Sequence, residues 1–278
     1  MKVLVTGVTG FIGKKLAEEL VKVGVEVIGL AREKVTSQPY KVIKGDLFDA
    51  KLIESIMQGV DGVVHLAAIT THNEIVKNKY KTHEVNYLGT KTLLEVFNKL
   101  STTKVFIYSS NGKVYGDIQA LPITEEHPTF PINALGKSKF ITEQLIDYYS
   151  NYDKSYLIFR IFNVYGENQR DQFLVPTIVN QLKKSTTIVL GDIEGKRDFI
   201  YISDVIKSLI KGLHCKTLNN GLQRYNICSG KPISPADIVK VIEEITGENI
   251  NIEVDQKLLR VDEISTEYGS YEKAKNKF

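Results

Sequence analysis

Three glycines near the start of the chain have the spacing of a phosphate-binding turn. Gly7, Gly10 and Gly13 recur at three-residue intervals directly after the apolar residues 3–5. Glycine lacks a Cβ, so it permits a tight turn, a close approach to pyrophosphate and close packing of a helix on a strand. The unpaired N–H groups at the start of the next helix would face the anion. The pattern favours a dinucleotide site over an ordinary turn between a strand and a helix.

The elements around this turn support the prediction. Apolar residues follow it with helical spacing up to the stop signal Gly24. Beyond Gly24, apolar strands alternate with helical segments, which predicts a parallel sheet with helices on both faces. We expect strands at residues 3–5, 25–30, 41–44, 62–68, 104–110, 156–161, 188–190, 224–228 and 251–254. We expect helices at residues 50–58, 78–100, 135–149 and 234–246. A further helix is expected to begin at Pro176, and another to begin at a cap formed by Ser203 or Asp204 and to end at Leu213.

These elements predict an α/β fold with two parts. Residues 1–162, with part of 186–228, would form an NAD(P)-binding domain built on a Rossmann-type doubly wound parallel sheet. Residues 163–278 would form a smaller, interleaved and discontinuous C-terminal α/β lobe. That lobe would cover the carboxyl edge of the sheet, where such folds bind ligands.

The composition excludes several classes of protein. The 36 basic and 33 acidic residues are scattered and nearly balanced, so nothing calls for nucleic acid. Cys215 and Cys228 stand apart in apolar segments, which favours core thiols over a disulfide framework or a metal site. No apolar run approaches the ~20 residues that span a bilayer, and the first strand leads directly into the glycine turn without room for a signal peptide. We therefore expect a cytoplasmic protein without a membrane partner.

Polar residues at the ends of three predicted strands have open roles. Arg32 follows the second strand, where NAD sites usually carry an acid, so the sequence slightly favours NADP over NAD. Arg32 is otherwise a solvated surface charge. Asp46 either contacts adenine or caps the following turn. His65 is expected to be a hydrogen-bonded core histidine rather than a catalyst.

Seven motifs in chain order resemble the extended short-chain dehydrogenase/reductases, and among these the nucleotide-sugar epimerases and dehydratases. The resemblance runs from residue 1 to about residue 275. The motifs are Thr6-Gly-Val-Thr-Gly-Phe-Ile-Gly13, Gly45-Asp46-Leu47, His65-Leu-Ala-Ala68, Val85-Asn86-Tyr-Leu-Gly89, Val114-Tyr-Gly116, Arg160-Ile-Phe-Asn-Val-Tyr-Gly166 and Arg197-Asp-Phe-Ile-Tyr201.

The resemblance implies binding roles for particular residues and a homodimer formed by the helices near residues 88–100 and 135–149. Those that would hold the cofactor are Gly7, Gly10, Phe11, Ile12 and Gly13 at the pyrophosphate, Asp46 and Leu47 at adenine, Leu66, Ala67 and Ala68 along its length, and Lys139 at the ribose. Those that would grip the diphosphate of a nucleotide-sugar are Asn163, Arg197 and, as a second clamp, Arg260, since guanidinium groups suit phosphate oxygens.

The expected catalytic residues are where the chain departs from the family. The family's Tyr-x-x-x-Lys falls on Leu135 to Lys139, so the proton-carrying phenol is replaced by leucine. Asn111 stands where the family has a serine or threonine; an amide can polarise a carbonyl but is no general acid or base near neutral pH. Lys113 stands where dehydratases place an acid, and it is either a base with a lowered pKa or a solvated loop charge.

Three functions remain open on this evidence. The first, which we favour, is an NAD(P)-dependent oxidoreductase, epimerase or reductase acting on a nucleotide-sugar with non-standard acid and base residues. Tyr115 or Tyr165 could then replace the missing phenol. The second is a catalytically impaired protein that binds the cofactor and the nucleotide-sugar as a regulator or partner subunit. The third is a reductase of a carbonyl compound without a nucleotide.

Overall fold

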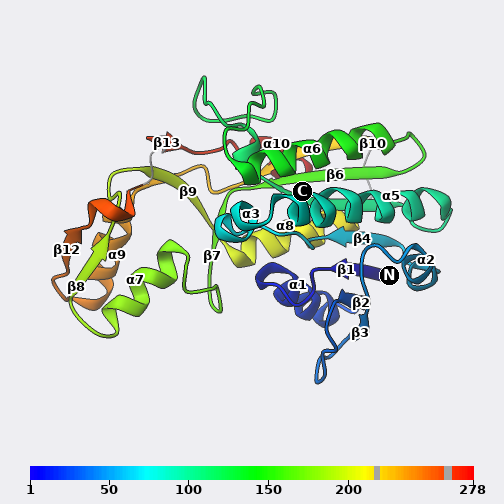
Figure 1. Cartoon of the computed structure of the whole chain (residues 1–278), viewed down its shortest axis with the longest axis horizontal. Coiled ribbons are helices and arrows are strands. Elements are labelled where there is room, and N and C mark those ends of the chain that lie inside the picture. Colours follow the sequence, from blue (N-terminus) through cyan, green and yellow to red (C-terminus); the bar gives the residue numbers. More distant parts are fainter. Residues whose placement is uncertain (216–219, 260–264) are drawn as a thin grey trace.

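A seven-stranded parallel sheet forms the main body of the protein (Figure 1). The structure, a computed structural model, describes residues 1–215, 220–259 and 265–278. The strand order is β10-β6-β5-β4-β1-β2-β3. The chain places β2 and β3 on one side of β1, and then crosses over to place β4, β5, β6 and β10 on the other side of β1. The strands are β1 (Lys2–Thr6), β2 (Glu26–Ala31), β3 (Lys41–Lys44), β4 (Gly62–His65), β5 (Val105–Asn111), β6 (Ser155–Ile161) and β10 (Gly221–Ile227). The reversal between β1 and β4 creates the crevice at which doubly wound sheets bind ligands.

Helices cover both faces of this sheet, as the alternation of elements predicted. The helices α1 (Phe11–Lys22), α8 (Ile202–His214) and α10 (Glu272–Lys277) lie on one face, with Val3 and Val5 in their core cluster. The helices α2 (Ala50–Met57), α5 (Gly89–Lys99) and α6 (Ala134–Tyr149) lie on the other face. Leu4 stands between Val3 and Val5 in the sequence, but its side chain belongs to the core on this second face. Side chains alternate along a strand, so a continuous apolar strand feeds two separate cores.

A smaller lobe projects from the main body at the left of Figure 1. It contains α7 (Leu174–Leu182), β8 (Thr187–Leu190), α9 (Pro235–Thr246) and β12 (Asn251–Val254), and its core includes Ile178, Ile188 and Val239. A four-stranded sheet made of β7 (Asn163–Tyr165), β9 (Lys196–Tyr201), β11 (Pro232–Ile233) and β13 (Thr266–Glu267) accompanies it. Because α8 and β10 return to the main body, the lobe is interleaved with the main sheet.

Three of the differences from the sequence predictions concern the ends or the regularity of predicted elements. The strand predicted over residues 62–68 ends at His65, because the chain turns there toward the glycine turn. Neither Ser203 nor Asp204 caps α8, which follows β9 without a break and begins at Ile202. The helix predicted over 78–100 is continuous but irregular: α4 (Lys79–His83), a π-helical turn (Glu84–Leu88) and α5 follow one another, after the short α3 (His72–Lys77).

A carboxylate binds a backbone N–H at the outer edge of β10. The Gly221 N–H donates to the Lys154 carbonyl at the start of β6, and the Ile227 carbonyl accepts from Phe162. The backbone groups of the even-numbered residues of β10 therefore face outward. One of them, the Asn226 N–H, donates to the Glu125 carboxylate at 2.7 Å.

Candidate functional site

The glycine turn is shaped by close contacts of its backbone. Gly7 has a φ of +70°, and a Cβ there would lie 2.7 Å from the Ala67 nitrogen. A Cβ on Gly13 would lie 2.2 Å from the Gly7 carbonyl oxygen. Gly10 is the N-cap of α1 and provides no side-chain cap. The half-buried Phe11 and Ile12 pack on the core beside it. The turn therefore fits a pyrophosphate: only hydrogen fits at Gly7 and Gly13, and the helix N–H groups have no capping side chain.

A hollow of about 140 Å³ adjoins the glycine turn on the side of β2 and β3. Arg32, the first residue after β2, is exposed near this side of the sheet. Asp46 is also exposed, and its carboxylate accepts the Phe48 N–H at 3.2 Å, so it does cap a turn, while Leu47 is buried. The residues that line the hollow are Val8, Thr9, Lys14, Val35, Gln38, Tyr40 and Val42.

A chain of hydrogen bonds fixes the loop that follows β4. Thr90 donates to the Asn86 carbonyl at 2.6 Å, so it accepts from His65 Nε2 at 2.8 Å. His65 Nδ1 then accepts from the Thr6 hydroxyl at 2.6 Å, and that oxygen accepts the Ala67 N–H at 3.2 Å. Burial, with the nearby Lys139 charge, lowers the pKa of His65 to about 3. The prediction of a hydrogen-bonded core histidine is confirmed. The half-buried Leu66, Ala67 and Ala68 lie beside the glycine turn.

Asn86 is a positioning residue that the sequence reasoning did not single out. Its side chain accepts the Ile69 N–H at 2.7 Å and donates to the Ile69 carbonyl at 3.0 Å and to the Ser138 hydroxyl at 2.9 Å. It lies in the π-helical turn, a feature that is frequent at functional sites. Its place in the Val85–Gly89 motif was the available signal. Asn86 joins the loop after β4 to α6.

Lys139 is anchored on α6 without the tyrosine of the family pattern. Its ammonium donates to the Ser109 carbonyl at 2.6 Å and lies 4.7 Å from the centre of the Tyr108 ring. The side chain is 3% exposed, and burial lowers its pKa to about 8, against the attraction of Glu143. Leu135 lies one helical turn earlier and is half-buried.

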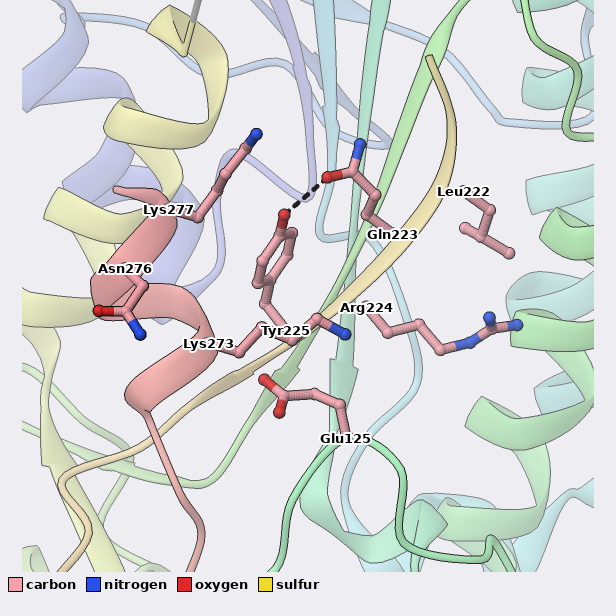
Figure 2. A pocket seen from close by; sticks show the side chains of 8 residues that line it. All are labelled: Glu125, Leu222, Gln223, Arg224, Tyr225, Lys273, Asn276 and Lys277. Carbon is pink, nitrogen blue, oxygen red and sulfur yellow. Dashed lines mark hydrogen bonds between the residues drawn. The ribbon is translucent and has the colours of Figure 1, made fainter. Parts of the chain in front are cut away.

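Glu143 holds α6 against the sheet one turn beyond Lys139. This fully buried carboxylate accepts from the Ser110 hydroxyl on β5 and from the Arg160 guanidinium on β6, at 2.7 Å from Nη2. Arg224 on β10 lies 3.7 Å away and also donates to Asp147 at 2.9 Å. Figure 2 shows the Arg224 side chain extended toward the helices. Contacts with three strands fix the position of the helix that carries Lys139.

Asn111 is the last residue of β5, and Lys113 lies in the turn that follows and that touches the start of α6. The Asn111 carboxamide oxygen accepts the Lys113 N–H at 3.0 Å in the short 3-10 turn Gly112–Val114. A Cβ on Gly136 would lie 2.3 Å from the Lys113 carbonyl oxygen, so this turn touches the helix beside Leu135. The Lys113 ammonium forms a salt bridge with Glu267 on β13. The sequence analysis considered Lys113 as a base or as a solvated loop charge, and neither role included this carboxylate partner.

Asn163 and Arg197 lie on adjacent strands, β7 and β9. The Asn163 amide donates to the Asp198 carbonyl at 3.0 Å, and Arg197 Nη1 donates to the Lys196 carbonyl at 2.9 Å. Asp198 is fully buried, and its carboxylate accepts backbone N–H groups of Ser229 at 2.7 Å, Gly230 at 2.9 Å and Gly269 at 3.2 Å. Burial raises the pKa of Asp198, and those hydrogen bonds oppose the change. Arg260 lies outside the described residues.

The two tyrosines considered as replacements differ in availability. Tyr115 is fully buried, its hydroxyl donates to the Asn226 side chain at 2.6 Å, and burial raises its pKa to about 12. Tyr165 is half-buried at the end of β7, with its ring 5.4 Å from that of Tyr201. Tyr115 is thus committed to the core.

A second hollow lies beside β10. A groove of about 630 Å³ follows the outer side of β10, bounded by Lys273, Asn276 and Lys277 of α10 (Figure 2). Glu125 and the β10 residues Leu222, Gln223, Arg224 and Tyr225 complete its lining. It lies away from the carboxyl ends of the strands and from the glycine turn. In the part of the chain that the structure describes, no cluster of acidic, histidine or cysteine side chains suits a metal ion, and no helix is long and apolar enough to cross a membrane.

Comparison with known proteins identifies similar sequences and structures. A model of the NAD-dependent epimerase/dehydratase family matches residues 3–228. A putative UDP-glucose 4-epimerase of Methanocaldococcus jannaschii is 32% identical, covering 88% of this chain and 82% of the relative. A GDP-6-deoxy-D-talose 4-dehydrogenase of Aggregatibacter actinomycetemcomitans is also 32% identical, covering 99% and 90%. The structure of UDP-glucuronic acid 4-epimerase from Bacillus cereus, in complex with UDP-glucuronic acid and NAD, has a TM-score of 0.88 at 26% identity and covers 100% of this chain and 92% of that one.

Proposed function

Because the chain belongs to the NAD-dependent epimerase/dehydratase family, we propose that it is an NAD(P)-dependent enzyme that acts on a nucleotide-sugar with non-standard acid and base residues. One observation carries the proposal: the groups that would hold both ligands are retained while the phenol is lost. Gly7 and Gly13 leave no room for a side chain, and Lys139 is buried and anchored beside Ser109. Relatives described as acting on UDP- and GDP-linked sugars support the substrate class.

We propose the binding roles that the resemblance to the family implies. Gly7, Gly10, Phe11, Ile12 and Gly13 would receive the pyrophosphate at the start of α1, Asp46 and Leu47 would flank adenine, Leu66, Ala67 and Ala68 would line the site, and Lys139 would hold the ribose. Asn163 and Arg197 would hold the diphosphate of the sugar, with Arg260 as a second clamp. When bound, the nicotinamide supplies a hydride acceptor or donor. The smaller lobe, within residues 163–278, would close over the sugar and exclude water from it.

Proton transfer needs another group, because Leu135 has no ionisable proton. The Asn111 amide nitrogen can donate to the reacting sugar oxygen and polarise a carbonyl, since its oxygen is held by the Lys113 N–H. We propose Tyr165 in preference to Tyr115 as the replacement phenol, because the Tyr115 hydroxyl is buried and already donates to Asn226. The salt bridge to Glu267 argues against Lys113 as the base.

A direct test follows the nicotinamide absorbance with a panel of UDP- and GDP-linked sugars and their 4-keto derivatives. We expect turnover by the natural chain and its loss in Tyr165→Phe, with Tyr115→Phe as the control that lowers stability instead. If calorimetry shows cofactor binding but no sugar changes the absorbance, the enzyme proposal fails.

The second candidate, a binding protein without turnover, is favoured by the loss of both proton-handling residues. The double variant Leu135→Tyr with Asn111→Ser separates the two functions. Activity that appears only in this variant would establish the natural chain as a binding protein. A third candidate, a reductase of a carbonyl compound without a nucleotide, gains weight only if UDP and GDP fail to compete for the site.

Three finer features belong to the same proposal. Arg32 supports a slight preference for NADP, because it is exposed at the end of β2 and no acid stands at that strand tip. A homodimer through α5 and α6 is supported by Leu88, Ile141 and Tyr148, which are 40%, 44% and 82% exposed. A reducing, cytoplasmic location is supported by the two cysteines, which are free thiols.

A further inference from the structure

Lys139 places an ammonium group where water is nearly excluded. The side chain is 3% exposed. Its ammonium donates to the carbonyl of Ser109 on β5 at 2.6 Å. Burial disfavours the charged form of a lysine and lowers the pKa of Lys139 to about 8. The ammonium form therefore depends on neighbouring groups that replace the stabilisation by water.

The ring of Tyr108 is one such group. Tyr108 is 1% exposed, and the Lys139 nitrogen lies over its ring at 4.7 Å from the ring centre. The face of an aromatic ring is electron-rich and attracts a cation, most strongly where water is absent. Within the described part of the chain, the Tyr108 hydroxyl forms no hydrogen bond with the Lys139 ammonium. The contact is therefore made by the face of the ring.

Two further titratable groups, Glu143 and His65, interact with the charge of Lys139. Glu143 follows one turn later on α6 and attracts the ammonium, but its carboxylate also binds the Arg160 guanidinium at 2.7 Å. His65 on β4 has its ring 5.8 Å from that of Tyr108, and it is neutral near pH 7 because its pKa is lowered to about 3. Of these three described neighbours, the Tyr108 ring is the one that attracts the ammonium without also binding another cation.

We propose that Tyr108 is a positioning residue for the cofactor: the face of its ring keeps Lys139 in the ammonium form, so that this side chain can donate to a ribose hydroxyl. The inference rests on the proposed function, which assigns Lys139 to the ribose. An ammonium group has three N–H donors, and the Ser109 carbonyl takes one of them. A neutral amine has fewer donors and no charge, so its hydrogen bond to the ribose would be weaker. The affinity for the cofactor should therefore follow the protonation of Lys139.

The experiment measures two quantities on the full chain. NMR of isotope-labelled lysine side chains gives the pKa of Lys139, and Lys139→Met identifies its signal. Calorimetry with NAD and NADP gives the affinity near pH 6 and near pH 8. Tyr108→Leu removes the ring, so the pKa of Lys139 should fall by about 1 and the affinity near pH 8 should fall roughly fivefold. Near pH 6 both proteins keep the ammonium form, and the affinity should change by less than about twofold.

Three further variants separate this effect from a loss of packing. Tyr108→Phe keeps the ring, so the pKa of Lys139 and the affinities should match those of the natural chain. A trifluorinated phenylalanine at position 108 keeps the shape of the ring but withdraws electrons from its face. It should therefore lower the pKa of Lys139 even if Tyr108→Leu folds poorly. Phe106→Leu removes another fully buried ring of β5, which packs against Phe97, and it should lower stability without changing the pKa of Lys139.

Several results would overturn the inference and leave the proposed function intact. One is an unchanged pKa of Lys139 in the fluorinated variant, and another is an equal fall of this pKa in Phe106→Leu or in Tyr108→Phe. Binding that weakens as much near pH 6 as near pH 8 would show a loss of packing instead. A natural chain in which Lys139 titrates as expected, but which binds neither NAD nor NADP, would refute the proposed function and with it the role of Tyr108 in ribose binding.

Discussion

Replacing the glycines of the turn by alanine tests the phosphate-binding site most directly. In Gly13→Ala the new methyl would lie 2.2 Å from the Gly7 carbonyl oxygen and 2.8 Å from its carbon. Both atoms belong to the backbone, so no side-chain rotation relieves the contact. In Gly10→Ala the methyl would lie 3.2 Å from the same oxygen, a tight but tolerable distance. Gly24 provides the control, because its φ is +79° but its Cβ would meet nothing within 4 Å.

The three variants should separate stability from cofactor affinity. In Gly13→Ala, overpacking should lower the free energy of unfolding by about 1–3 kcal/mol. The higher helix propensity of alanine should offset up to about 1 kcal/mol of this loss. Left-handed strain at Gly24 costs about 1–2 kcal/mol, so Gly24→Ala should lose as much stability as Gly13→Ala. Gly10→Ala should lose less than about 1 kcal/mol. Only the variants in the turn should bind the cofactor more weakly, by roughly tenfold or more, because each lost hydrogen bond to a charged group is worth about 1.5–3 kcal/mol.

Urea denaturation measures the stability, and calorimetric titration with NAD and NADP measures the affinity. If Gly10→Ala and Gly13→Ala bind both cofactors as tightly as Gly24→Ala does, the glycine turn is not the pyrophosphate site. Weaker binding in Gly24→Ala would show that the loss follows from general destabilisation instead.

The remaining predictions concern the core and the helix pair. Glu143→Gln leaves the buried Arg160 without its charge partner, so the free energy of unfolding measured in urea should fall by about 3–5 kcal/mol. The control Asp147→Asn changes an exposed carboxylate and should leave this free energy almost unchanged. A fall below about 1 kcal/mol in Glu143→Gln would contradict the account of the Glu143–Arg160 pair. Burial lowers the pKa of His65 in the folded chain to about 3, whereas the ordinary value is 6.5. Below pH 6.5 the unfolded chain therefore takes up a proton at this histidine while the folded chain does not, and this difference favours unfolding. The melting temperature should therefore fall between pH 6.5 and 3, and His65→Gln should flatten the dependence. Ile141→Glu should convert the proposed dimer to a monomer in sedimentation analysis, whereas Lys79→Glu on α4 should not.

The sequence predicted the fold well because its signals are local. Continuous apolar strands specify their own conformation. The helix predicted over residues 234–246 is present as α9, which Ser234 caps and which ends at Gly247 in the left-handed conformation. The errors occur where tertiary contacts overrule local signals. Residues 66–68 are as apolar as a strand, yet they leave the sheet to lie against Gly7. Ser203 and Asp204 could cap a helix, but β9 continues into α8 before either is reached.

The candidate site was predictable only in part, for a related reason. The glycine turn and Lys139 lie in short motifs whose spacing carries their meaning. The partners of Lys113 and Asp198 are 154 and up to 71 residues away, and no local pattern announces them. Asn86 lies in a π-helical turn, whose wider hydrogen-bonding pattern shifts the register of the helix, and the apolar periodicity of the sequence does not announce such a turn.

The carboxylate at the outer edge of β10 has a consequence for how the protein behaves at high concentration. An exposed edge strand invites a strand from another molecule, the first step toward fibrillar aggregation. The Glu125 carboxylate accepts the Asn226 N–H, so this donor is not available to an added strand. Lys273 and Lys277 of α10 line the same groove (Figure 2). Charged side chains at the edge of a sheet disfavour pairing with another strand. The charged groove beside β10 thus opposes the addition of an eighth strand to the sheet.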